Sequence, residues 1–145
     1  VYPDFFKVAV SNAGNHDNSI YNRWWSEKHH GVKEIISDKQ DTSFTYSIDK
    51  NPDVAKNLKG RLLLIHGEID NNVHPANTIR VVNALINANK RFDMLILPTQ
   101  RHGFGNMTEH WFWRTADYFC RWLLGDTTER TTDLEEMNRE VEKKK

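Results

Sequence analysis

The alternation of apolar runs and polar turns is clearest between residues 61 and 104. Residues 62–65 and 94–97 are unbroken apolar runs, a pattern typical of strands that are covered on both faces of a sheet. Between these runs Pro75 suits the first position of a helix, and apolar residues then recur at helical spacing at Ile79, Val82, Leu85 and Ile86. The order of strand, helix and strand predicts one α/β unit of a parallel sheet, with this apolar helix face against the sheet.

Weaker signals on both sides extend this architecture. Residues 5–10 predict a short strand, and the polar segment 11–18 that follows consists of turn formers. Residues 51–60 begin with Asn-Pro-Asp and end in glycine, which predicts a short helix. Residues 106–109 offer a cap for a helix that ends near Gly125 and has one face made of Phe112, Ala116, Phe119 and Leu123. The expected fold class is α/β, a mostly parallel sheet with flanking helices.

Residues 19–50 do not follow the alternation, because they are polar but contain clustered aromatic rings. Gly31 could end a short helix that carries Tyr21, Trp24 and Trp25. Two interpretations of these rings remain open. They either pack the helix onto the rest of the domain or form the wall of a pocket.

The composition changes again at the C-terminal end. Residues 126–145 are rich in charge, with acidic residues early and three lysines last, which predicts a helix whose charges match its dipole. We therefore divide the chain into a domain over residues 1–125 and a charged helical tail over residues 126–145. A helix of this length is only marginally stable alone in water, so the tail is expected to pack against another surface.

Overall composition sets few limits on function. Lys plus Arg and Asp plus Glu are equal at 20 each, so bulk charge gives no reason to expect a nucleic acid partner. The one cysteine, Cys120, excludes an internal disulfide and is expected to be a buried thiol. No apolar run approaches the ~18 residues of a membrane span.

The histidines give no clear metal signature. His29 and His30 are adjacent and lack the one-face spacing of a helical zinc motif, so we expect no metal and no other cofactor. His66 ends a predicted strand and His74 precedes a proline. Local packing or hydrogen bonding within turns is the favoured interpretation for both.

Two residues with catalytic chemistry follow the two predicted strands. Asp70 lies in the loop after the first strand and His102 in the loop after the second. In open parallel sheets, sites are built from the loops at the carboxyl ends of the strands. A carboxylate can orient an imidazole ring and stabilise its protonated form, and Asp followed by His is the second half of the Ser, Asp, His order of α/β-hydrolases. We therefore expect Asp70 and His102 to meet.

The sequence around both residues is similar to that of a known family. The stretches HGEIDNNVHPANT at 66–78 and LPTQRHGF at 97–104 resemble the end of the catalytic domain of the prolyl oligopeptidase and dipeptidyl peptidase IV family of serine peptidases. This resemblance implies that Asp70 and His102 are the Asp and His of a catalytic triad. It also implies that Tyr21, Asn72 and Val73 contact the substrate.

By the same resemblance the chain is the C-terminal portion of an α/β-hydrolase fold, incomplete without upstream strands. Its 145 residues are fewer than the ~200–250 of a large single α/β domain. No serine of the chain lies in a Gly-x-Ser-x-Gly turn, so the nucleophile is expected upstream and the fragment alone is expected to be inactive.

The resemblance also implies partners and a location. The expected partners are a peptide substrate, the N-terminal half of the catalytic domain, an N-terminal β-propeller and a second copy of the chain. The expected location is periplasmic or secreted. Two alternatives remain open: an esterase or other acyl hydrolase, because a triad does not fix the acyl group, and a non-catalytic surface for assembly.

Overall fold

The central sheet of this protein has three parallel strands. In the computed structural model, which describes residues 2–29, 32–39, 41–46 and 49–127, these are β1 (Val8–Asn12), β4 (Arg61–Gly67) and β5 (Asp93–Leu97). β4 lies in the middle and pairs with both neighbours, with Val8 opposite Arg61 and Leu63 opposite Asp93. The prediction of a parallel sheet is confirmed.

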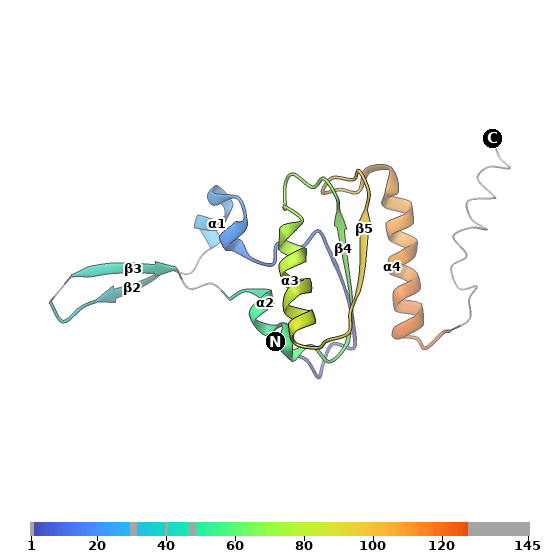
Figure 1. Ribbon diagram of the computed structural model, residues 1–145, viewed down its shortest axis with the longest axis horizontal. Helices are drawn as coiled ribbons and strands as arrows, with labels where there is room; N and C mark the ends of the chain where they lie inside the picture. The colour runs from blue at the N-terminus through green and yellow to red at the C-terminus, as the bar shows by residue number, and fades with distance from the viewer. Residues whose placement is uncertain (1, 30–31, 40, 47–48, 128–145) are drawn as a thin grey trace.

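Helices cover both faces of this sheet (Figure 1). α3 (Ala76–Asn87) packs on one face with the short helix α2 (Asn51–Val54) and the 3-10 turn η2 (Ala55–Asn57), and α4 (Thr108–Trp122) packs on the other. The remaining elements are the 3-10 turns η1 (Asn18–Ile20) and η3 (Gly105–Met107), helix α1 (Arg23–His29), and an antiparallel hairpin of β2 (Val32–Ile36) and β3 (Thr42–Tyr46). The hairpin, which the sequence analysis did not predict, extends away from the sheet (Figure 1).

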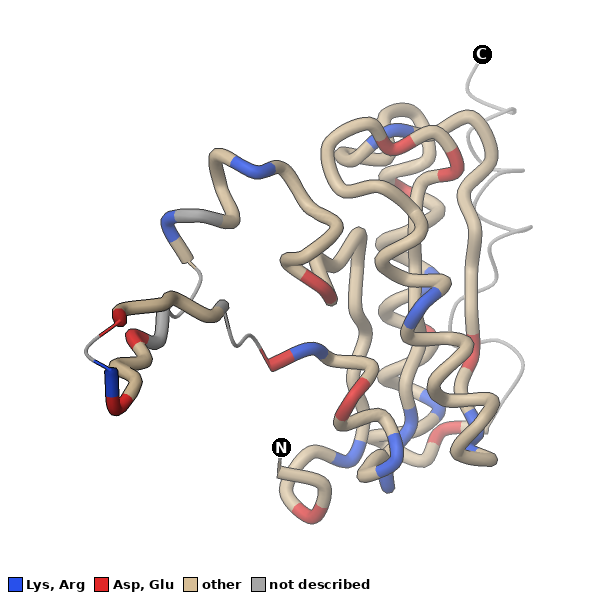
Figure 2. The backbone as a smooth tube through the Cα atoms, turned by 60° about the vertical axis from the view of Figure 1, so that its left-hand side comes forward, with Lys and Arg blue, Asp and Glu red and all other residues tan. Residues whose placement is uncertain are grey.

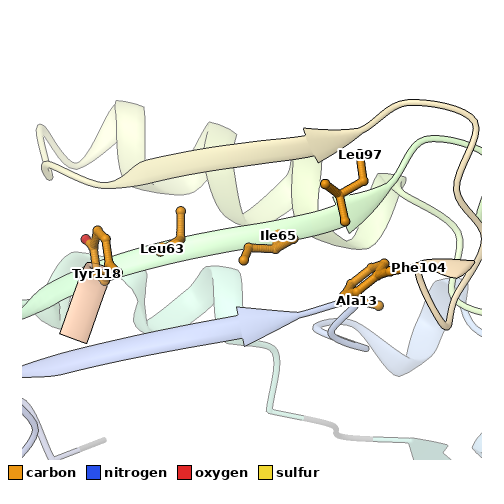
Figure 3. Packing of buried hydrophobic residues seen from close by; sticks show 6 residues of the cluster. All are labelled: Ala13, Leu63, Ile65, Leu97, Phe104 and Tyr118. Atoms are coloured by element: carbon orange, nitrogen blue, oxygen red, sulfur yellow. The ribbon is translucent and has the colours of Figure 1, made fainter. Parts of the chain in front are cut away.

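The middle strand supplies both halves of the core because its side chains alternate between the two faces. Leu63 and Ile65 pack with Ala13, Leu97, Phe104 and Tyr118 in the layer under α4 (Figure 3). Leu64 packs on the other face with Ala55, Val81 and Leu85. Fully burying one such aliphatic side chain stabilises the fold by about 1.5–3 kcal/mol, so β4 is the anchor of both layers.

Helix α3 turns a different face to the sheet from the one its apolar residues predict. Leu85 is buried as expected, but Ile79 and Ile86 are exposed and Val82 is only partly buried. The buried side chains of α3 are Asn77, Thr78, Val81 and Leu85. Asn77 and Thr78 form hydrogen bonds to other segments, so polar contacts as well as apolar burial set the rotation of this helix.

Helix α4 differs from its predicted face for a related reason. It begins at Thr108 with Glu109 in its first turn, as expected, but Phe112 and Leu123 are exposed. The layer under α4 instead contains Trp111, Tyr118 and Trp122. The Trp111 indole N–H donates to Asn12 Oδ1 at 2.9 Å, and the Tyr118 hydroxyl donates to Asp93 Oδ2 at 2.8 Å. Tryptophan and tyrosine can bury their ring carbons and still donate a hydrogen bond to the sheet. A prediction from the spacing of apolar residues does not include such bonds.

Two strand predictions were also wrong in detail. β1 begins at Val8 rather than at residue 5 and extends through Asn12, because pairing with β4 starts where Arg61 N donates to the Lys7 carbonyl. β5 is not covered on both faces, since Met94 and Ile96 remain partly exposed at this edge strand.

The Cys120 side chain is half-buried, whereas the sequence analysis predicted a buried thiol. The predicted helix end at Gly31 and the tail from residue 128 lie outside the described residues.

Acidic and basic residues are interspersed along the described backbone (Figure 2). Among the described residues, no helix has the length and apolar character needed to cross a membrane.

The rotation of α3 is testable with two adjacent residues. Leu85 is 1% exposed and Ile86 is 59% exposed. Leu85→Ala should lower the free energy of unfolding by about 2–5 kcal/mol, because it removes core contacts, whereas Ile86→Ala should change it by less than about 1 kcal/mol. Urea unfolding of both variants measures the difference. Equal losses would mean that the predicted face, not the observed one, packs on the sheet.

Candidate active site

The loops that follow β4 and β5 meet at one edge of the sheet. Both strands run in the same direction, so their carboxyl ends are neighbours. Glu68 N donates to the Leu97 carbonyl at 3.0 Å, and Ile69 N donates to the Gln100 carbonyl at 3.1 Å. Thr99 N donates to Glu68 Oε2 at 2.9 Å. These bonds fix the second loop against the first.

Gly67, the last residue of β4, makes this close approach possible. A Cβ atom at this position would lie 2.5 Å from the Gln100 carbonyl oxygen and 2.6 Å from the Arg101 carbonyl oxygen. Both neighbours are backbone atoms, which cannot move aside as a flexible side chain can. The absence of a side chain at Gly67 therefore lets the loop that carries His102 cross the end of β4.

Asp70 is buried within the first loop, and the loop itself holds its carboxylate. Asp70 Oδ1 accepts hydrogen bonds from the backbone N–H groups of Asn72, at 2.9 Å, and Val73, at 3.0 Å. Asp70 Oδ2 accepts from His102 Nδ1 at 2.9 Å. Burial by itself raises the pKa of Asp70, but the bonds from the His102 ring and from the two backbone groups outweigh it. The pKa of Asp70 therefore lies below its ordinary value, and the group is a carboxylate at neutral pH.

The contact with Asp70 fixes the hydrogen positions of the His102 ring. A carboxylate only accepts hydrogen bonds, so Nδ1 of His102 carries the hydrogen of their 2.9 Å bond. In the neutral ring Nε2 then has the lone pair. The His102 side chain is 44% exposed, whereas that of Asp70 is fully buried. The pair is thus an accessible base that is oriented by a buried carboxylate, and the expectation that the two residues meet is confirmed.

The structure also brings Tyr21 to the same loop from a distant part of the sequence. The Tyr21 hydroxyl donates to Asn72 Oδ1 at 2.7 Å, and the Tyr21 ring contacts Trp25 edge to face. Trp24 is largely exposed, so it does not pack α1 onto the sheet. Two of the three predicted substrate-binding residues therefore contact each other beside Asp70. Val73 is 5% exposed, and its direct contact with a substrate stays a prediction.

A polar network that the sequence analysis missed holds the segment before Tyr21. Asn77 Oδ1 accepts from the backbone N–H groups of His16, at 3.1 Å, and Asp17, at 3.0 Å. Asp17 forms a 2.7 Å ion pair with Arg80 and caps η1 by accepting from Ser19 N at 2.9 Å. Burial raises the pKa of Asp17, but these bonds outweigh it and hold the pKa below its usual value. No signal in the sequence indicated this network, because Asn77 does not lie on the helix face that the apolar residues predict.

His66 and His74 both have hydrogen-bond partners. His66 Nδ1 lies 2.7 Å from Thr78 Oγ1, and His66 Nε2 lies 2.8 Å from the Val73 carbonyl oxygen. His74 Nδ1 accepts from Ala76 N at 3.1 Å. These contacts agree with the predicted packing and turn bonding. Within the part of the chain that the structure describes, no three His, Cys, Asp or Glu residues gather as a metal site would require.

Comparison with known proteins finds relatives over most of the chain. Residues 1–126 match the prolyl oligopeptidase family. The chain is 34% identical over 110 residues to dipeptidyl peptidase family member 1 of Caenorhabditis elegans. The aligned residues cover 73% of this chain and 12% of that protein. The chain is 27% identical over 124 residues to venom dipeptidyl peptidase 4 of Apis mellifera, covering 83% of this chain and 15% of that protein.

A solved structure is similar in fold. The crystal structure of Porphyromonas gingivalis dipeptidyl peptidase 4 matches with a TM-score of 0.62 and 30% identity, covering 78% of this chain and 16% of that one. The chain therefore spans less than a fifth of the length of each of these relatives.

The role of Gly67 can be tested against a second glycine of the site. Gly67→Ala should destabilise the protein by about 1–3 kcal/mol, because its methyl group would collide with two backbone carbonyl groups. In Gly103→Ala, the matched control, the new Cβ would have nothing within 4 Å. Urea unfolding measures both effects. If Gly67→Ala is tolerated as well as Gly103→Ala, the close approach of the loop is not a real constraint.

Proposed function

Because the chain belongs to the prolyl oligopeptidase family and has the α/β-hydrolase fold of its structural relatives, we propose that it forms the C-terminal part of the catalytic domain of a serine peptidase. The observation that carries this proposal is the 2.9 Å bond between Asp70 and His102 at the carboxyl edge of a parallel sheet. Asp70 and His102 are two members of the triad. The serine nucleophile and the oxyanion hole belong to a segment upstream of this chain.

In this proposal His102 moves the protons of the reaction. Its Nε2 takes the proton of the serine hydroxyl as the serine oxygen bonds to the substrate carbonyl carbon. The imidazolium then gives that proton to the leaving amine as the peptide bond breaks. Asp70 holds the ring in place and stabilises its positive charge. Water repeats the same sequence to release the acyl group from the serine.

The substrate class follows from the relatives and from the contact between Tyr21 and Asn72. Three relatives are dipeptidyl peptidases by name, and we propose that the full-length protein removes dipeptides from the amino end of peptides. Asn72 Oδ1 already accepts from the Tyr21 hydroxyl. The amide N–H groups of Asn72 then remain to donate to a substrate carbonyl group. Tyr21, Asn72 and Val73 together form the proposed substrate-binding subsite.

The remaining parts of the proposal concern the full-length protein. They are an N-terminal β-propeller, contacts between copies, a periplasmic or secreted location, and a helical tail over residues 126–145 that follows the domain. The first three rest on the family resemblance, and the tail rests on the order of charges in the sequence. The mass of the full-length protein in solution tests the contacts between copies, and a monomer at high concentration would contradict them.

Asp70→Asn in the full-length protein is the principal test of the triad. We expect kcat for dipeptide release to fall by about 10⁴-fold, because an amide at this position no longer selects the productive tautomer of His102. Asp53→Asn is the matched control, since it removes the same charge from an exposed position on α2, and its kcat should not change. Dipeptidyl chromogenic substrates provide the measurement. Near-normal turnover by Asp70→Asn would remove Asp70 from the triad.

Unfolding measurements on Asp70→Asn separate catalysis from stability. The pKa of Asp70 is lowered in the folded protein, so its carboxylate stabilises the fold at pH values above the unfolded pKa of ~3.9. This contribution is lost as the pH falls through the folded pKa. The variant should therefore be somewhat less stable than the wild type at pH 7, and the difference should shrink below about pH 4. It should still be folded at the pH of the assay.

A serine-directed fluorophosphonate probe tests where the nucleophile lies. The 145-residue chain should remain unlabelled, because none of its serines has the glycine setting of a nucleophile turn. The full-length protein should be labelled once, at a serine upstream of this chain. Mass spectrometry of the labelled peptide gives the position. Stoichiometric labelling of the 145-residue chain would contradict the proposal that it is inactive alone.

A further inference from the structure

His66 is a polar residue in an apolar row. Along β4 the side chains of Leu62 and Leu64 join the layer under α3, and alternation places His66 in the same row at the carboxyl end of the strand. His66 is 0% exposed. Burying an imidazole ring costs free energy unless both of its nitrogens are hydrogen-bonded. Packing alone does not account for a histidine in place of another leucine here.

The contacts of the ring determine where its hydrogen is. His66 Nε2 lies 2.8 Å from the Val73 carbonyl oxygen and 3.3 Å from Asp70 Oδ2. Both oxygens only accept, so Nε2 carries a hydrogen. In the neutral ring the Thr78 hydroxyl, 2.7 Å away, then donates to Nδ1. Thr78 is itself buried on α3, which fixes the ring from its other side.

The His66 ring also lies beside the oxygen of Asp70 that the loop of Asp70 does not hold. The two backbone N–H groups of the loop both bind Oδ1. Oδ2, the oxygen that accepts from His102, has His66 as its other neighbour. His66 also holds the Val73 carbonyl group, whose own residue donates to Oδ1. The ring therefore holds the turn whose Val73 N–H binds the carboxylate, and it lies against the other carboxylate oxygen.

We propose that His66, held by Thr78, is a positioning residue that keeps the Asp70 carboxylate aligned with His102. This inference rests on the proposed function, because alignment matters only if the pair is catalytic. It assigns a role to a residue that touches neither the substrate nor the reacting atoms. Rigid support of this kind determines whether a catalytic group lies within the small displacement that the reaction tolerates.

Two substitutions of His66 in the full-length protein separate positioning from packing. The amide nitrogen of glutamine reaches the place of Nε2, whereas that of asparagine reaches only the place of Nδ1. His66→Asn should therefore lower kcat on the order of 10- to 100-fold, with KM within about threefold of the wild type. His66→Gln should restore most of the lost kcat. A kcat for His66→Asn within threefold of the wild type, or no rescue by glutamine, would overturn the proposal.

Thr78 provides a second test that holds if the His66 variants do not fold. Thr78→Val keeps the shape of the side chain and removes the hydroxyl, whereas Thr78→Ser keeps the hydroxyl and removes a methyl group. If the hydroxyl positions His66, the valine variant should have the lower kcat, by about 3- to 10-fold. If Thr78 only packs, the serine variant should be at least as impaired, and the proposal is wrong.

Two further variants isolate this proposal from other effects. Leu85→Ala destabilises the same layer between α3 and the sheet without touching the loop at Asp70, so its kcat should equal that of the wild type. A fall in kcat for Leu85→Ala as large as that for His66→Asn would assign the effect to lost stability and overturn the positioning role. Asp70→Asn reports on the triad itself. If it stays active, the proposed function fails; if it is inactive while His66→Asn is active, only the role of His66 fails.

Discussion

A buried carboxylate that must stay ionised is the constraint on which the rest of this structure depends. Asp70 is 3% exposed, and a charge in such a place costs several kcal/mol unless donors surround it. The protein supplies two backbone N–H groups and the His102 ring. Two of these donors come from the loop of Asp70 itself and one comes from the loop after β5. Satisfying one side chain thus fixes these two loops relative to each other.

The fold and the central pair could be predicted because both depend on local patterns. The apolar runs of β4 and β5 are long enough to predict strands without knowledge of their neighbours. The order of strands in an α/β unit then places Asp70 and His102 at one edge. Tyr21 and Asn72 were predicted only through the family resemblance, since nothing in their spacing shows that they meet. The sequence supports a site most directly where strand ends determine the geometry.

The predictions that failed concern which face of an element is buried. On α3 the apolar residues Ile79 and Ile86 suggested one face, and Asn77 and Thr78 occupy the buried one. On α4 the tryptophan and tyrosine rings replace the expected Phe112 face. In both helices the buried face depends on specific hydrogen bonds to residues far away in sequence, and the spacing of apolar residues does not reveal such bonds.

The hairpin of β2 and β3 was missed for another reason. Its strands pair with each other rather than with the central sheet, and its apolar residues Ile36 and Phe44 are exposed.

The two polar residues at the start of α3 explain why that helix departs from its apolar pattern. Asn77 binds the backbone of His16 and Asp17, in the segment that leads to Tyr21. Thr78, the next residue, binds His66 beside Asp70. One turn of one helix therefore supports both the proposed substrate-binding side and the proposed catalytic side of the site. An apolar residue at either position would bury more carbon but would leave the buried partners, the backbone N–H groups of His16 and Asp17 or the His66 ring, unpaired. Each unpaired group costs about 1–3 kcal/mol. On this argument the hydrogen bonds of Asn77 and Thr78 set the rotation of α3. The exposure of the apolar residues on its other face is the consequence.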